Sequence, residues 1–160
     1  MKVVVDMSFL LDKAFSRKYE QYFSDKLNKR GITNTPTLSN CDDHGIDIEC
    51  DNGMLIDVKC YRKPLVVDSF DGVFIETYLP LSGNPGWYED PKKKTNEYIF
   101  VIDCDSYEIS YKKAYMMSKM MLKLAVSRAE KEGKLQFKKT KTGCGFILPY
   151  QYLDTYGGIV

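Results

Sequence analysis

The sequence contains no run of 18 or more apolar residues, the length that a membrane-spanning helix needs. The first residues, 1–6, are also too few for a secretion signal. We therefore expect the chain in the cytoplasm of the cell that makes it, with no membrane partner. A length of 160 residues and an apolar content of 44% are ordinary for a globular protein. We expect one domain over residues 1–160.

The five cysteines include no C-x-x-C pair, and their odd number argues against a disulfide framework. We expect reduced thiols. Cys41, His44 and Cys60 would supply only part of a zinc site, so buried or idle cysteines are the simpler interpretation. The sequence also lacks an internal repeat and a glycine-rich phosphate loop, which argues against repeat folds and P-loop enzymes.

The net charge of only +1 conceals an uneven distribution along the chain. Residues 1–80 carry 10 Lys and Arg against 13 Asp and Glu, whereas residues 81–160 carry 13 against 9. An acidic half joined to a basic half suits an enzyme that binds metal and nucleic acid, because phosphates need cationic neutralisation. Proteins that bind no polyanion can show the same asymmetry, so this pattern alone does not decide the function.

Residues 45–59 have the pattern of a β-hairpin, with two short alternating runs on either side of an Asn-Gly pair. A three-residue loop with the glycine in a left-handed conformation would pair Ile48 with Ile56 and Ile46 with Val58. A two-residue turn would instead place apolar side chains beside carboxylates on both faces. Since a slip of one residue moves every side chain to the other face, the apolar pattern selects the three-residue loop.

In the selected register Asp47 faces Asp57, and like charges that face each other in a sheet are destabilising. Lys59 lies on the same face, about 7 Å further along the strand. Two carboxylates that repel unless a cation lies between them, with a lysine alongside, suit a hard divalent cation such as Mg²⁺. The alternative is a solvated polar face of an antiparallel sheet.

These residues resemble the signature of the PD-(D/E)XK nuclease superfamily, which has an acidic residue at the start of one strand and (D/E)-x-K on the next. The matching residues are Gly45-Ile46-Asp47 and Asp57-Val58-Lys59, with Ile46 where the family often has proline. The resemblance implies an α/β fold with an αβββαβ restriction-endonuclease-like core, in which helices flank a mixed sheet. It also implies Mg²⁺, with Mn²⁺ as a substitute, held by Asp47, Asp57 and the backbone carbonyl of Val58.

Two further carboxylates are candidates for the same site. The apolar spacing is helical from about Ser8 or Asp12 to Arg30, and the resemblance implies that this first helix brings Glu20 toward the metal. Residues 72–78 predict a third strand beside the hairpin, and its Glu76 is a candidate ligand or a partner that orients Lys59. Either carboxylate could instead be an ordinary solvated side chain.

Residues 82–94 predict an irregular loop, because Gly and Pro are frequent there. Trp87 and the run Lys92, Lys93 and Lys94 suit contacts with nucleobases and phosphates, although Trp87 could equally cover the core. A Gly-Trp pair after a Glu-bearing strand also resembles phage and mobile-element members of the superfamily. The other candidate nucleic-acid contacts are His44, Arg62, Lys63, Lys138 and Lys139.

The rest of the chain predicts structure rather than chemistry. Residues 97–103 are nearly all apolar and predict a central strand buried on both faces. Residues 110–132 predict one long helix, and residues 145–148 predict a last short strand.

The resemblance implies a divalent-metal-dependent nuclease that hydrolyses phosphodiester bonds, and we expect DNA as its substrate. The expected catalytic residues are Asp47, Asp57, Lys59, Glu20 and Glu76. One alternative is a catalytically inactive nucleic-acid-binding module with the same fold, and another is a protein-interaction domain whose hairpin matches by chance. A homodimer is one way to cut both strands of a duplex, but the sequence shows no obvious dimer helix.

Overall fold

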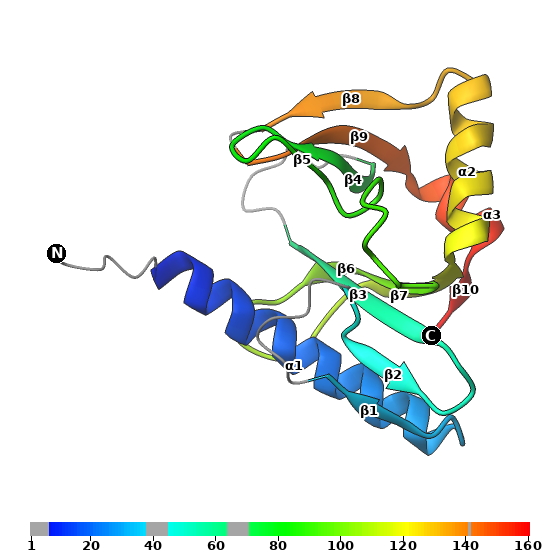
Figure 1. Ribbon diagram of the computed structural model, residues 1–160. Helices are drawn as coiled ribbons and strands as arrows, with labels where there is room; N and C mark the ends of the chain where they lie inside the picture. Colours follow the sequence, from blue (N-terminus) through cyan, green and yellow to red (C-terminus); the bar gives the residue numbers. More distant parts are fainter. Residues whose placement is uncertain (1–6, 38–44, 64–70, 141) are drawn as a thin grey trace, which may run out of the picture.

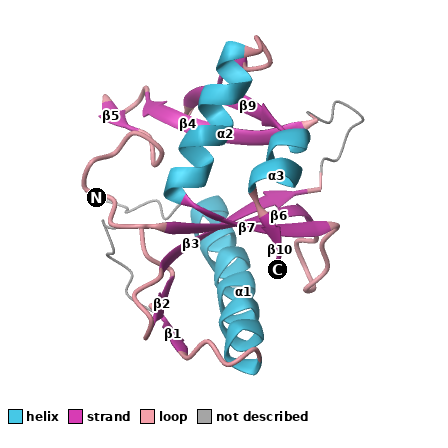
Figure 2. Ribbon diagram, turned by 90° about the vertical axis from the view of Figure 1, so that its right-hand side faces the viewer, coloured by secondary structure: helices cyan, strands magenta, loops and turns pink. Residues whose placement is uncertain are grey.

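The computed structural model describes residues 7–37, 45–63, 71–140 and 142–160. Within these residues the protein has three layers (Figure 1): a long helix, α1, covers one side of a mixed sheet, and a second sheet faces the other side. Two further helices, α2 and α3, lie at one end of the layers and span the space between the two sheets (Figure 2). The protein is therefore a mixed α/β protein.

The larger sheet is mixed and has the strand order β1-β2-β3-β6-β7-β10. Its central pair, β3 and β6, is parallel, whereas its other neighbours are antiparallel. The bounds of its strands are Asn34–Pro36 (β1), Ile48–Cys50 (β2), Leu55–Arg62 (β3), Glu97–Cys104 (β6), Lys113–Ser118 (β7) and Gly158–Ile159 (β10). The prediction of a central strand near residues 97–103 is confirmed, since β6 lies between β3 and β7.

The smaller sheet is antiparallel and has the strand order β5-β4-β9-β8. The bounds of its strands are Gly72–Leu79 (β4), Asn84–Pro85 (β5), Gln136–Lys139 (β8) and Cys144–Pro149 (β9). The bounds of the helices are Met7–Lys29 (α1), Lys119–Lys131 (α2) and Tyr150–Tyr156 (α3).

Apolar side chains fill both spaces between the layers. Between α1 and the larger sheet, Phe15, Tyr19, Phe23 and Leu27 recur every four residues and form one stripe along the helix. This stripe confirms the predicted helix, which ends just before Gly31 in a left-handed conformation at φ 83°. The second core lies between the two sheets and contains residues of both, together with residues of α2 and α3.

The hairpin between β2 and β3 has the predicted register. Ile48 pairs with Ile56, and both side chains are fully buried against α1. The loop has three residues, and it is closed by a hydrogen bond from the Cys50 N–H to the Met54 carbonyl. Gly53 has φ 91°, the left-handed conformation that the loop requires.

Two predictions about the fold are wrong. The strand over residues 72–78 exists as β4, but it belongs to the second sheet, and the neighbour of β3 on that side is β6. The predicted helix over residues 110–132 is a strand, β7, followed by the shorter helix α2. Strand β7 has buried side chains on both faces, and this made its apolar spacing resemble that of a helix.

None of the helices in the described part of the chain is both long enough and apolar enough to cross a membrane.

Candidate active site

Asp47 lies where the ladder between β2 and β3 ends. Beyond the pair of Ile48 and Ile56, the Asp47 N–H donates to the Ile56 carbonyl at 2.8 Å. The Asp47 carboxylate then turns toward β3, where its Oδ2 atom accepts a hydrogen bond from the Val58 N–H at 2.8 Å. The side chain of Asp47 therefore reaches the backbone of β3 one residue from Asp57.

Asp57 is buried, with 5% of its surface exposed, and it has a cationic partner on its own strand. The Nζ atom of Lys59 lies 2.9 Å from Oδ2 of Asp57. The same Nζ atom lies 4.7 Å from the centre of the Trp87 ring, a distance at which a cation is attracted to an aromatic face. Lys59 is thus held between the Asp57 carboxylate and Trp87, on the face of β3 that the sequence predicted.

The charge of Asp57 acts on the Asp47 carboxyl group. Burial raises the pKa of Asp47 to about 8, and the nearby charges of Asp57 and Glu20 contribute to this rise. The hydrogen bond from Val58 and the charge of Lys59 lower it, but they do not compensate. The raised pKa of Asp47 means that a negative charge on its carboxyl group is unfavourable in the folded protein unless another cation lies nearby.

Glu20 approaches Asp47, and Glu76 approaches Lys59, from layers on opposite sides of the larger sheet. Glu20 comes from α1, and its charge reaches Asp47. Glu76 comes from β4 in the smaller sheet. Burial raises its pKa, while the charge of Lys59 and a hydrogen bond from the backbone N–H of Trp87 lower it. Glu76 is therefore within electrostatic reach of Lys59 even though β4 does not pair with β3.

Close backbone contacts around Glu76 hold its side chain in place. A Cβ atom added at Gly143 would lie 2.7 Å from Glu76 Oε2, and one added at Gly86 would lie 2.5 Å from the Glu76 carbonyl oxygen. Larger residues at these two positions would collide with Glu76. The Tyr61 hydroxyl, from β3, donates to the Phe74 carbonyl of β4 at 2.9 Å and ties the two sheets together beside the site.

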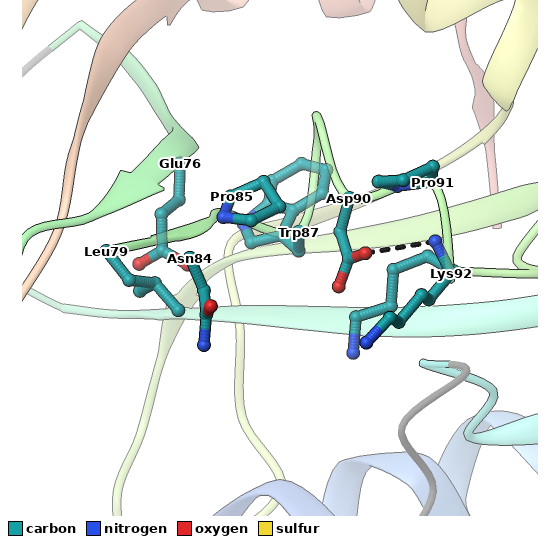
Figure 3. Close-up of a pocket in the computed structure, with 9 residues that line it drawn as sticks. Glu76, Leu79, Asn84, Pro85, Trp87, Asp90, Pro91 and Lys92 are labelled. Carbon is teal, nitrogen blue, oxygen red and sulfur yellow. Dashed lines mark hydrogen bonds between the residues drawn. The ribbon is translucent and has the colours of Figure 1, made fainter. Parts of the chain in front are cut away.

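Figure 3 shows a pocket of about 530 Å³ that is lined in part by Trp87, and the centre of the Trp87 ring lies 4.7 Å from the Nζ atom of Lys59. Strand β4, strand β5 and the loop after it supply its walls, and Trp87 belongs both to the pocket and to the surroundings of Lys59. The lining residues are Glu76, Leu79, Asn84, Pro85, Trp87, Asp90, Pro91, Lys92 and Lys93. Two of the predicted loop lysines and the predicted tryptophan therefore line one cavity.

Lys93 connects this pocket to the start of β2. A Cβ atom added at Gly45 would lie 2.8 Å from Cδ of Lys93, so the lysine stem passes over Gly45, two residues before Asp47. The buried Thr95 donates from its Oγ1 atom to the Gly45 carbonyl at 2.8 Å and fixes the same approach. Thr95 was missed because no local pattern links it to a residue 50 positions earlier.

Several predicted nucleic-acid contacts are not gathered at this site. The Arg62 guanidinium lies 4.4 Å from the Phe15 ring centre, where it packs on α1, and Lys63 follows at the exposed end of β3. Lys138 and Lys139 belong to β8, the edge strand of the smaller sheet, whereas the aspartates belong to the larger one. Lys94 does not line the pocket. His44 lies outside the described residues.

The donors at the site fit a magnesium ion. Among the residues that the structure describes, no three Asp, Glu, His or Cys side chains are grouped as a metal site. Mg²⁺ does not need such a cage, because it is usually held by one or two carboxylates together with waters and substrate phosphates. Asp47 and Asp57 supply two carboxylates. The backbone of Val58 contacts Asp47 through its N–H, which donates to Oδ2 of Asp47.

No protein-family model matches this chain, and no curated protein matches it.

Proposed function

We propose that this protein is a divalent-metal-dependent nuclease that hydrolyses phosphodiester bonds in DNA, built on the core of the PD-(D/E)XK superfamily. The observation that carries the proposal is the arrangement of Asp47, Asp57 and Lys59. The charge of Asp57 raises the pKa of Asp47, which lies where the ladder between β2 and β3 ends, and the Nζ atom of Lys59 lies 2.9 Å from Asp57. A solvated polar face would leave such carboxylates apart and exposed, whereas Asp57 is buried.

The order of elements supports the proposal. Helix α1 is followed by the antiparallel strands β1, β2 and β3, which matches the first four elements of an αβββαβ core. Strand β6 then lies parallel to β3 as the next strand of the sheet. In this interpretation the smaller sheet is an addition to the core, because β4 and β5 stand in the chain where the core has a helix.

In the proposed mechanism, Asp47, Asp57 and the Val58 carbonyl would hold Mg²⁺, and the ion would supply Lewis-acid polarisation of the scissile phosphate and of a water. Lys59 orients the attacking water and stabilises negative charge that develops on the phosphate oxygens. Contact with Trp87 keeps the Lys59 ammonium group beside Asp57. The Glu76 carboxylate accepts a hydrogen bond from the backbone N–H of Trp87 and attracts the same ammonium group, which limits the directions in which that group can turn.

The test is incubation of the protein with circular and linear DNA, single- and double-stranded, and with RNA, in Mg²⁺, Mn²⁺ or EDTA. We expect cleavage of at least one DNA substrate in Mg²⁺ or Mn²⁺ and none in EDTA. Binding to DNA without cleavage of any substrate would overturn the proposal and would favour an inactive nucleic-acid-binding module. If the protein neither binds nor cleaves nucleic acid, the hairpin matches the nuclease signature only by chance.

A further inference from the structure

The pocket beside Lys59 has the size and the lining of a binding site for a small organic group. Its volume of about 530 Å³ is within the range of roughly 300–1,000 Å³ that is usual for ligand pockets. Trp87, Leu79 and two prolines supply apolar walls, and the Asn84 side chain adds an amide that can both donate and accept hydrogen bonds. Figure 3 shows the apolar and polar side chains around one space.

The loop that forms this pocket is wound on itself and attached to β4. The Gly86 N–H donates to the Thr77 carbonyl at 2.9 Å, and the Tyr88 N–H donates to the Glu76 carbonyl at 3.2 Å. The Lys92 N–H donates to Oδ1 of Asp90 at 2.9 Å, which closes a turn at the rim. The pocket is therefore formed before any ligand arrives, which lowers the entropic cost of binding.

Three lysines at and beside the pocket can contact the phosphate of a ligand. Lys92 and Lys93 line the pocket together with two carboxylates, Glu76 and Asp90, and the Nζ atom of Lys59 lies 4.7 Å from the centre of the Trp87 ring. The stem of Lys93 passes over Gly45, so the pocket is next to the start of β2, where Asp47 lies. A flat, partly polar ring in the pocket would leave an attached phosphate among these lysines and near the two aspartates.

We propose that this pocket holds the base of one unpaired nucleotide next to the scissile phosphate, and that the substrate is single-stranded DNA or DNA with an extruded base. A base inside a duplex is stacked on both faces and cannot enter a pocket walled by a tryptophan, so it must be unpaired or flipped out first. Aromatic walls hold bases of any sequence by stacking, while an amide such as that of Asn84 reads the base edge.

This inference rests on the proposed function for the identity of the neighbouring site, but it can be tested without cleavage. Trp87 is the single tryptophan of the chain and lines the pocket, so its fluorescence reports an occupant directly. The protein is titrated in EDTA with the four deoxynucleoside monophosphates and with deoxyribose 5-phosphate, which lacks a base. We expect a saturable change in Trp87 fluorescence with at least one nucleotide. The sugar phosphate should bind at least tenfold more weakly than that nucleotide.

Two variants locate the binding. Asn84→Phe fills the pocket from an exposed position and should weaken nucleotide binding at least tenfold. Leu81→Phe, at a position that is 83% exposed and does not line the pocket, is the matched control and should bind within twofold of the wild type. Equal affinity for the base-free probe, undiminished binding by Asn84→Phe, or no binding of any nucleotide would each overturn the inference.

The two assays of the wild-type protein, nucleotide binding and cleavage, separate this inference from the proposed function. Base-dependent binding by a wild-type protein that cleaves no nucleic acid would remove the nuclease proposal alone. Cleavage by a wild-type protein that binds no nucleotide would remove the pocket inference alone.

Discussion

The Nζ atom of Lys59 lies 2.9 Å from Oδ2 of Asp57, and the two residues are two positions apart on β3. The Lys59 side chain keeps 24% of its surface exposed, whereas the Asp57 side chain keeps 8%. The lysine therefore stands between the buried carboxylate and solvent, where a substrate phosphate would arrive. This placement distinguishes the role of Lys59 from that of the aspartates, and it leads to separate predictions for each.

Replacing Lys59 should abolish cleavage without abolishing metal binding. Lys59→Met keeps the apolar stem but removes the charge, and it should lower the cleavage rate about 100-fold or more, as removal of a group that stabilises a transition state does. Mg²⁺ affinity, measured by calorimetry, should be unchanged or higher, because a competing cation has left Asp57. Lys29→Met, on the exposed last turn of α1, is the control. Cleavage by Lys59→Met at the wild-type rate would remove the lysine from the mechanism.

Asp47→Asn should make the metal-free protein more stable while removing its response to Mg²⁺. The pKa of Asp47 is raised from 3.8 to about 8 in the folded protein, so the ionised form is disfavoured there. Well below about pH 4, near the pKa of an unfolded aspartate, the carboxyl group is neutral in both states, and the wild type and the variant should be equally stable. The penalty on the wild type grows as the pH rises from there and is complete above the folded pKa of about 8.

Thermal unfolding in EDTA at pH 8 measures this difference. We expect Asp47→Asn to be more stable by at least about 1 kcal/mol, and each 1 kcal/mol is about 2–4 °C in Tm for a chain of this size. Saturating Mg²⁺ should stabilise the wild type by mass action and leave the variant unchanged. A wild type more stable than the variant in EDTA at pH 8 would show that burial and the neighbouring carboxylates do not destabilise the ionised form of Asp47.

The loop lysines should contribute to nucleic-acid affinity by neutralising phosphates. Lys92→Gln, Lys93→Gln and Lys94→Gln together should weaken binding to all sequences alike. For each phosphate that is no longer neutralised, the slope of log K against log salt should decrease in magnitude by about 0.7 on single-stranded DNA and about 0.9 on duplex DNA. The matched control replaces Lys29 and Arg30, both exposed, by glutamine. An unchanged salt slope in the triple variant would show that the loop does not touch phosphates.

The Tyr19 hydroxyl should be worth a measurable part of the stability. It lies 2.9 Å from the Asp105 carbonyl oxygen and 2.8 Å from that of Ser110, so it ties α1 to the connection between β6 and β7. Tyr19→Phe should lower the free energy of unfolding in urea by about 1–3 kcal/mol, because the one hydroxyl proton that these carbonyl oxygens share would be lost. Tyr107→Phe, 89% exposed, should change it little. Equal effects would contradict this anchoring role.

The hairpin was predictable because its signals are local. The Asn-Gly pair fixes a tight loop, and the alternation of Ile48 and Ile56 with charged neighbours leaves one register that buries both. Helix α1 was predictable for the same reason, since its apolar stripe has a single helical period. The register predicted that Asp47 would lie opposite Asp57. In the structure Asp47 lies beyond the last ladder pair, and its side chain reaches the backbone of β3 at Val58.

The second sheet was not predictable from local patterns. Val73 and Ile75 alternate along β4 as in any half-buried strand, and nothing in that alternation says which sheet they join. In the structure they pack against the larger sheet from the opposite side, in the core that contains Tyr98 and Phe100. The approach of Glu76 to Lys59, and the pocket beside it, depend on this packing. They therefore could not be derived from spacing along the chain.

The most direct measurement is the Mg²⁺-dependent cleavage of DNA by the wild type, by Asp57→Asn and by Glu49→Gln. Glu49 is the matched control because it is an exposed acidic residue of the same hairpin, on β2. We predict that the wild type and Glu49→Gln cleave DNA equally and that Asp57→Asn, although folded, does not cleave it. Cleavage by Asp57→Asn at the wild-type rate would contradict this prediction.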